Sequence, residues 1–274
     1  MIRFNPFLNA RFAVFLLAPV LAMSLVLGGC TQKAPEYKES PVETLYNQAM
    51  DALLIENYEV AIEKFDEVER QHPYSFWATK AQLMVAYTHY LRNGYDDAIV
   101  ALNRFIQLHP TNKDVAYAFY LKGLSYYEQI SDVARDQKMT SLALSTLDEL
   151  IKRFPKSKYS RDAKLKIDLT RDHLAGKEME IGRYYHNKKH YLAAINRFKS
   201  VIDNYQTTTH VPEALHRLTE AYLALGVNEE ARKTAAVLGH NFPGSEWYLD
   251  SYRMMGNEVA VPANKKKKPW YKVW

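Results

Sequence analysis

The chain has 274 residues and a formal net charge of +5. Arg3 and Arg11 contribute two of these charges and the run Lys265–Lys268 contributes four, which leaves the rest of the chain at −1. The folded part therefore lacks the broad positive field that binding to nucleic acid requires. The single cysteine, Cys30, excludes a disulfide within the chain.

The first residues have the order of a bacterial lipoprotein signal peptide. Positive charges at Arg3 and Arg11 precede a nearly continuous apolar run over 12–26, and small residues then lead to Cys30. We expect cleavage of residues 1–29 and covalent attachment of lipid to Cys30. A single transmembrane anchor is the alternative, but the run is shorter than the roughly 20 residues that a membrane span needs.

Residues 30–41 are predicted to be a lipid-anchored polar tether. The residue after the cysteine is Thr31, whereas an Asp at this place usually retains bacterial lipoproteins in the inner membrane. We therefore expect a protein that is anchored in the outer membrane by its lipid and faces the periplasm.

A short pattern then repeats five times along the chain. Each copy has an alanine, an apolar residue four positions later, another three positions further, and usually a proline five positions beyond. Spacings of four and three place these side chains on one face of a helix, which the proline ends. The copies are Ala61, Phe65, Val68 and Pro73; Ala98, Leu102, Phe105 and Pro110; Ala143, Leu147, Leu150 and Pro155; Ala194, Phe198 and Val201, with Gln206 in place of proline; and Ala231, Ala235, Leu238 and Pro243.

A small residue or a near equivalent marks a second helix before each of these helices. It lies twelve residues before four of the alanines, at Ala49, Ala86, Gly182 and Thr219, and twenty residues before Ala143, at Gly123. The third copy therefore contains an insertion of about eight residues. Paired helices at this spacing resemble the tetratricopeptide repeat, whose period is about 34 residues. The predicted fold class is an all-α superhelix of about five tetratricopeptide-like helical hairpins.

The predicted elements divide the chain into two groups of repeats and a tail. Residues 42–157 hold repeats 1–3, and residues 158–257 hold a long spine helix, near 160–186, and repeats 4–5. The basic and aromatic tail, 258–274, either rests on anionic headgroups, contacts a partner subunit or only aids solubility. The expected helices cover 42–55, 58–72, 76–92, 95–109, 113–130, 137–154, 160–186, 189–204, 210–225, 228–241 and 245–255.

The chain shows no motif of an enzyme or of a metal site. His186 and His190 have the spacing of two metal ligands on one helix, but they flank the expected turn Asn187–Lys189. No nucleophile elbow accompanies the serines and histidines. We predict no catalytic residue, no metal and no cofactor other than the lipid on Cys30.

Tyrosine is unusually frequent, with 20 residues in the chain. Tyrosine offers a large contact area with few rotatable bonds, and the first helices of stacked repeats line a groove, so these side chains favour peptide binding. The alternative is that most of them pack between repeats. Those on predicted first helices include Tyr87, Tyr90, Tyr117, Tyr120, Tyr126 and Tyr127.

Several stretches together resemble the BamD family of outer-membrane lipoproteins, which belong to the β-barrel assembly machinery. These stretches are the signal peptide with its cysteine, residues 104–110, the inserted third repeat ending at 153–159, residues 172–175 leading into 183–185, and residues 193–198. The similarity covers nearly the whole mature chain, although the tail after residue 264 is not part of the common family pattern.

The resemblance implies a scaffold and not a catalyst. The C-terminal repeats would dock the BamA subunit, with Arg197, beside Asn196, pairing with a BamA carboxylate, and other assembly lipoproteins would join. The N-terminal repeats would bind unfolded outer-membrane proteins, in particular their aromatic C-terminal signal. The implied peptide-binding residues are Tyr74, Phe76 and Trp77 of an exposed aromatic turn, together with Tyr87 and Tyr90.

Two other functions remain open from the residues alone. One is a periplasmic repeat adaptor that coordinates cell-wall synthesis. The other is an enzyme such as a lytic transglycosylase, which needs a catalytic glutamate in a separate compact domain, and the repeats leave no room for one.

Overall fold

The computed structural model describes residues 39–256. The chain divides into two units, Met1–Pro41 and Val42–Trp274, and the helices described below all belong to the second. The predicted signal peptide, the lipid site at Cys30, most of the tether and the tail 258–274 lie outside the described residues.

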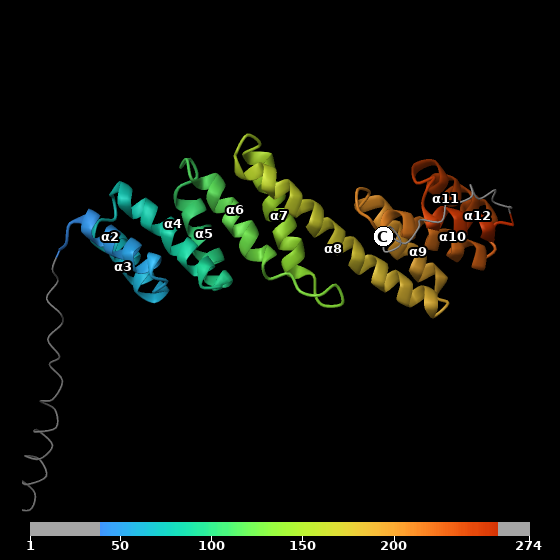
Figure 1. Ribbon diagram of the computed structural model, residues 1–274, viewed down its shortest axis with the longest axis horizontal. Helices are drawn as coiled ribbons and strands as arrows, with labels where there is room; N and C mark the ends of the chain where they lie inside the picture. Colours follow the sequence, from blue (N-terminus) through green and yellow to red (C-terminus); the bar gives the residue numbers. More distant parts are fainter. Residues whose placement is uncertain (1–38, 257–274) are drawn as a thin grey trace, which may run out of the picture. The chain divides into compact units, whose positions relative to one another are not determined.

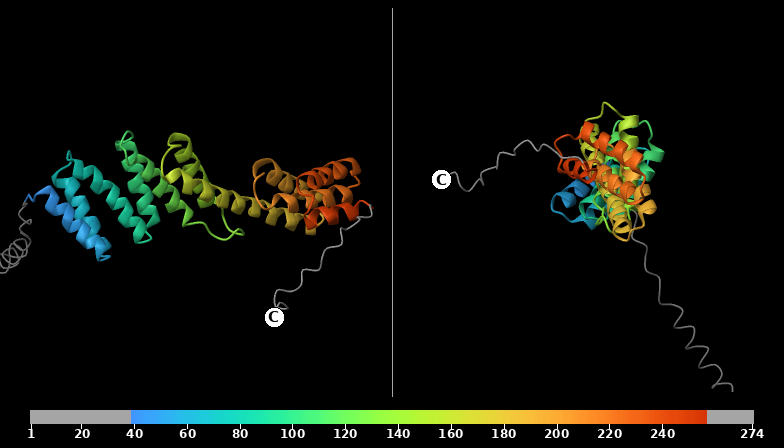
Figure 2. Two further views of the ribbon diagram at one scale, coloured as in Figure 1. Left: turned by 45° about the horizontal axis from the view of Figure 1, so that its top comes forward. Right: turned by 90° about the vertical axis from the view of Figure 1, so that its right-hand side faces the viewer.

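Residues 39–256 form helices and turns without a strand. The helices follow one another in chain order (Figures 1 and 2). Their bounds are close to the predicted ones: α2 Val42–Leu54, α3 Tyr58–Gln71, α4 Phe76–Leu91, α5 Tyr95–Leu108, α6 Val115–Tyr127, α7 Lys138–Arg153, α8 Tyr159–Asn187, α9 Tyr191–Asn204, α10 Val211–Ala224, α11 Asn228–Asn241 and α12 Glu246–Met254.

Consecutive helices pack as five hairpins. The pairs are α2 with α3, α4 with α5, α6 with α7, α8 with α9 and α10 with α11, and each hairpin also packs on the next. Helix α12 closes the series against α10 and α11. The predicted all-α superhelix of about five tetratricopeptide-like hairpins is confirmed.

The repeated residues form the core of every hairpin. The five alanines that define the repeat are all fully buried, and so are the apolar residues four and seven positions after them. The small residues of the first helices allow the close approach. A Cβ placed on Gly182 would lie 2.5 Å from Cε1 of Phe198, and one on Gly123 would collide with Leu147. Any larger side chain at these two places requires the helices to separate.

Four of the hairpin turns share one backbone conformation. Glu56, Asn93, Lys189 and Gly226 stand five residues before the repeat alanine, and each has a positive φ, between 60° and 74°. The next residue closes the turn with a backbone hydrogen bond of 2.8–2.9 Å, as from Asn57 N to Ala52 O. This is the Schellman ending of a helix, which satisfies carbonyls that the helix leaves without partners.

The third hairpin differs because residues 128–137 separate its two helices. This inserted loop lies along α8, where Lys177 Nζ donates a hydrogen bond to Ala134 O at 2.8 Å. Helix α8 has 29 residues, and at 1.5 Å per residue it is about 43 Å long. It packs on α7 along one part and on α9 along another, so it joins the third hairpin to the fourth.

No helix within residues 39–256 combines the length and the apolar character that crossing a membrane requires. The apolar run at 12–26 is outside this range.

Candidate functional site

Tyrosines from three helices gather on one surface that runs from the second repeat to the start of α8. Its members are Tyr87 and Tyr90 on α4, Tyr117 and Tyr120 on α6, and Tyr159 at the start of α8, and we call them the tyrosine surface. The rings of Tyr120 and Tyr159 stack with centroids 5.2 Å apart, and Tyr117 lies at the same distance from Tyr159. All five residues are half-buried, so each still presents part of its side chain to solvent.

Carboxylates accept hydrogen bonds from hydroxyls of this surface. Tyr120 donates to Asp162 Oδ2 at 2.5 Å, and Tyr90 makes a long contact of 3.5 Å with Glu128 Oε1. Burial and the neighbouring carboxylate raise the pKa of Tyr90 to about 12, and the same causes raise the pKa of Tyr120. Burial also raises the pKa of Tyr117. These tyrosines therefore stay neutral and act as hydrogen-bonding, aromatic contacts and not as bases.

Cations lie beside the same surface. Lys158 Nζ is 5.1 Å from the ring centre of Tyr159. Lys166 Nζ is 4.0 Å from Oδ2 of Asp162, the carboxylate that binds Tyr120, and 4.8 Å from the ring centre of the nearby Tyr127. Ring faces, hydroxyls, carboxylates and ammonium groups in one place suit the contact of a protein segment better than that of a small apolar ligand.

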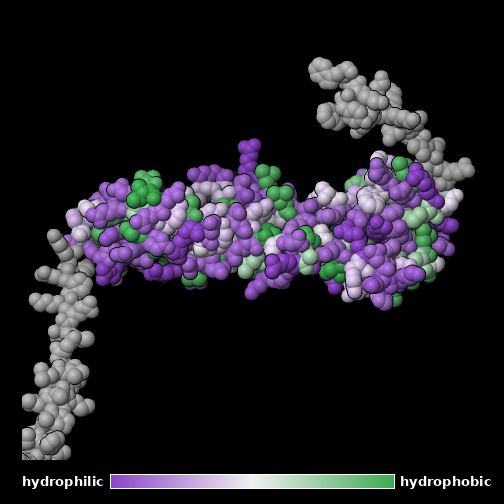
Figure 3. Space-filling view, turned by 60° about the horizontal axis from the view of Figure 1, so that its bottom comes forward, coloured by the Kyte–Doolittle hydropathy of each residue, from purple (hydrophilic) through white to green (hydrophobic). Residues whose placement is uncertain are grey.

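The aromatic turn after α3 is only partly as predicted. Tyr74 is fully exposed and Phe76 is 61% exposed. Trp77 is less exposed than predicted: it is half-buried, with its ring 4.7 Å from that of Tyr46 and against the core of the first hairpin. The reason is that Trp77 lies on the inner face of α4 in its first turn. The exposed hydrophobic residues on the face drawn in Figure 3 form separate patches.

Arg197 and Asn196 lie at a recess between α8 and α9. Arg197 Nη1 donates to both carboxylate oxygens of Glu178, at 3.2 and 3.4 Å. Asn196 is exposed beside it. The recess has a volume of about 250 Å³ and is lined by Glu178, Tyr185, Ala193, Asn196, Arg197 and Ser200.

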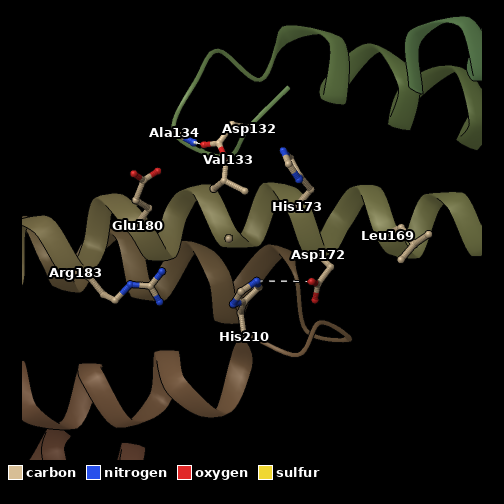
Figure 4. A pocket seen from close by; sticks show the side chains of 10 residues that line it. Asp132, Val133, Ala134, Leu169, Asp172, His173, Glu180, Arg183 and His210 are labelled. Carbon is tan, nitrogen blue, oxygen red and sulfur yellow. Dashed lines mark hydrogen bonds and ion pairs between the residues drawn. The ribbon is translucent and has the colours of Figure 1, made fainter. Parts of the chain in front are cut away.

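A larger recess of about 390 Å³ lies where the inserted loop meets α8 and the start of α10 (Figure 4). Its charged groups already contact one another: His210 Nε2 is 3.7 Å from Asp172 Oδ2, and Asp172 Oδ1 accepts from Thr209. Val133 projects from the loop toward α8. The contacts of Asp172 hold the start of α10 on α8.

Within residues 39–256 no group of three or more histidine, cysteine, aspartate or glutamate side chains is placed so that it could hold a metal ion. His186 instead contacts the ring of Tyr191 at 5.5 Å and lies 3.9 Å from Glu220, while His190 is exposed in the turn. The predicted turn between these two histidines is present.

Two important residues were missed by the sequence reasoning. Glu178 is nineteen residues from Arg197, and Tyr159 is 39 residues from Tyr120, so no local spacing connects them. Only the packing of α8 on its neighbours brings each pair together.

These features define the chain as a tetratricopeptide-like scaffold with an aromatic surface in its first repeats and an arginine-lined recess in its later ones. A family model described as "YfiO: Outer membrane lipoprotein" matches residues 38–238. The chain belongs to this family of outer membrane lipoproteins.

The curated relatives carry one common name, "Outer membrane protein assembly factor BamD". The relative from Caulobacter vibrioides is 50% identical over 93% of this chain and 84% of its own length. That from Rickettsia prowazekii is also 50% identical, over 88% and 97%. That from Neisseria meningitidis serogroup A is 33% identical over 93% and 97%. The family resemblance predicted from the sequence is confirmed.

Similar solved structures are also repeat proteins. The tetratricopeptide domain of P58(IPK) is 17% identical with a TM-score of 0.41, over 78% of this chain and 56% of that one. A tetratricopeptide protein of Thermus thermophilus is 17% identical with a TM-score of 0.38, over 79% and 100%.

Proposed function

We propose that this chain is a scaffold of outer-membrane β-barrel assembly that acts by binding and not by catalysis. It is anchored by lipid on Cys30, faces the periplasm and needs no other cofactor. The observation that carries this proposal is the 50% identity, over 93% of the chain, to a relative named as an outer membrane protein assembly factor.

The two groups of repeats have different partners in this proposal. Repeats 4–5 dock BamA through Arg197 and Asn196, and Arg197 is available because its side chain is 43% exposed at an open recess. Repeats 1–3 bind unfolded outer-membrane proteins. The tyrosine surface and the exposed Tyr74 and Phe76 support this assignment, because aromatic side chains give strong contacts at low entropic cost.

Docking is tested by affinity purification of the mature, lipidated protein from its native envelope, wild type beside Arg197→Glu. The wild type is expected to recover BamA and the variant to lose it, because the reversed charge repels a carboxylate. Recovery with both proteins would reject Arg197 as the docking residue. Absence of BamA from both, with capture of a cell-wall enzyme, would favour the periplasmic adaptor instead.

Substrate binding is tested with a labelled peptide that ends in an aromatic residue. The double variant Tyr74→Ala, Phe76→Ala should weaken binding at least tenfold, because truncating a central aromatic contact typically costs about 2 kcal/mol. Both side chains are exposed, so the fold should not change. Leu192→Ala, which removes an exposed residue of α9, is the matched control. Equal affinity of all three proteins would contradict the assignment of this turn.

A further inference from the structure

The recess beside Arg197 is built on one face of α9. Ala193, Asn196, Arg197 and Ser200 have spacings of three and four, so they form a single stripe along the helix. The stripe has a cation and an amide in its middle and a small residue at each end. The small side chains of Ala193 and Ser200 leave the space that makes up the recess.

The opposite wall of the recess belongs to α8 and orients the cation. Glu178 binds Nη1 of Arg197 and is only 21% exposed, whereas the arginine side chain is 43% exposed. Besides burial, the charge of Glu178 raises the pKa of the half-buried Tyr205, so this carboxylate lies among packed side chains. The recess therefore presents the guanidinium to solvent and keeps the carboxylate behind it.

The guanidinium has capacity for a second acceptor. It carries five N–H donors in a planar fork, which matches a carboxylate. Within residues 39–256 its hydrogen bonds use Nη1 alone. A carboxylate that enters over Ala193 would meet the remaining donors while Glu178 holds the other edge.

We infer that Ala193 and Glu178 make this recess a socket for one acidic side chain of the docking partner. Ala193 determines specificity, because it keeps open the space that the acid enters. Glu178 is a positioning residue, because it fixes the guanidinium in the orientation that leaves its other donors facing that space. The inference rests on the proposed docking through Arg197. It adds two residues, Ala193 and Glu178, that allow the guanidinium to bind the partner's carboxylate.

The role of Ala193 is tested by a matched pair of substitutions. Ala193 and Arg197 are four residues apart on one helix, so in Ala193→Asp the new carboxylate pairs with the guanidinium and takes the place of the partner's acid. Ala193→Asn adds the same bulk without the charge. Ala236→Asp, at an exposed alanine of α11, controls for the added charge.

In affinity capture from the native envelope, with BamA measured as the probe, Ala193→Asp should lower recovery at least tenfold. Ala193→Asn should also lower recovery, because its bulk fills part of the same space, but several times less than Ala193→Asp, because it does not pair with the guanidinium. Ala236→Asp should match the wild type. Wild-type recovery with Ala193→Asn would overturn the role of Ala193 in keeping the space open, and an equal loss in both Ala193 variants would overturn the acidic nature of the entering side chain. Wild-type recovery with Ala193→Asp, while Arg197→Glu loses BamA, would overturn the socket and keep the docking residue. No loss even with Arg197→Glu is a failure of the proposed docking itself.

The role of Glu178 is tested by truncation and rescue. Glu178→Ala should lower BamA recovery severalfold, because the guanidinium loses its fixed orientation. Glu178→Gln should restore most of it, since the amide oxygen still accepts from Nη1. A merely structural contribution would lower the melting temperature and recovery together in both variants. Unchanged recovery with a folded Glu178→Ala would contradict the positioning role.

Discussion

At the scale of single residues, three histidines have a pKa that burial lowers, and they make the fold sensitive to acid. His216 is almost fully buried on α10, and its Nδ1 lies 2.8 Å from Ser251 Oγ on α12. Burial lowers the pKa of His216 below its usual 6.5, and Arg217 adds to this, while Glu220, Asp250 and Glu213 oppose it. Burial also lowers the pKa of His89 and of His186.

These lowered pKa values predict destabilisation by acid. The unfolded chain binds protons more readily than the folded one, so the stability that neutral His216 contributes is complete above about pH 6.5 and is lost as the pH falls toward its folded pKa. Thermal melting between pH 8 and pH 5.5 should show a decreasing melting temperature. The decrease should be smaller in His216→Gln, and an equal decrease would assign the effect to the other histidines.

At the scale of elements, the hairpin turns use a left-handed residue whether or not it is glycine. An L-residue in this conformation costs roughly 1–2 kcal/mol, which glycine avoids. Glu56 and Lys189 adopt this conformation despite the cost, because the Schellman hydrogen bond and the packing of both helices determine the turn. Gly226 is the one glycine among the four equivalent turn residues named above.

Opposite substitutions at two of these turns should therefore have opposite effects. Glu56→Gly should stabilise the protein by about 0.5–1 kcal/mol, after allowance for the entropy of glycine in the unfolded chain. Gly226→Ala should destabilise it by about 1 kcal/mol. Urea unfolding measures both, and a loss of stability with Glu56→Gly would mean that contacts of the glutamate outweigh its backbone strain.

At the scale of the whole described region, hairpins contact mainly their neighbours. Within residues 39–256, no helix of the first two hairpins packs against α9–α12, and the core is divided into clusters that follow the chain. In such a stack, stability is approximately a sum over repeats and their interfaces. Local opening of one end need not unfold the other.

Damage to the last hairpin should accordingly remain local. Leu238 is fully buried between α11 and its neighbours, and Leu238→Ala should cost about 2–5 kcal/mol there. Hydrogen exchange should become faster in α10–α12 and stay unchanged in α2–α5. Faster exchange throughout would contradict the division into neighbouring units.

The repeat architecture was predictable from the sequence because its cause is local. The period of a helix is visible in residues such as Ala61, Phe65 and Val68, which are fully buried. They pack against a helix that is adjacent in the chain, so the pattern and its cause lie close together in the sequence. The family resemblance rests on the same order and spacing. Arg197 stands three residues after Ala194 and beside Phe198, which predicts an exposed face of α9, and its side chain is 43% exposed.

The side-chain surfaces were decided only by the tertiary structure. The burial of Trp77 depends on Tyr46, the tyrosine surface depends on three helices meeting, and the recess at Arg197 depends on Glu178 from another helix. Periodicity states which face of a helix is buried, but it does not state which side chains of two helices meet. That choice comes from the register in which each helix packs on its neighbours: α4 on α2, α8 on α6, and α9 on α8. The sequence alone therefore determined the fold, and the tertiary structure determined which side chains form the candidate binding sites.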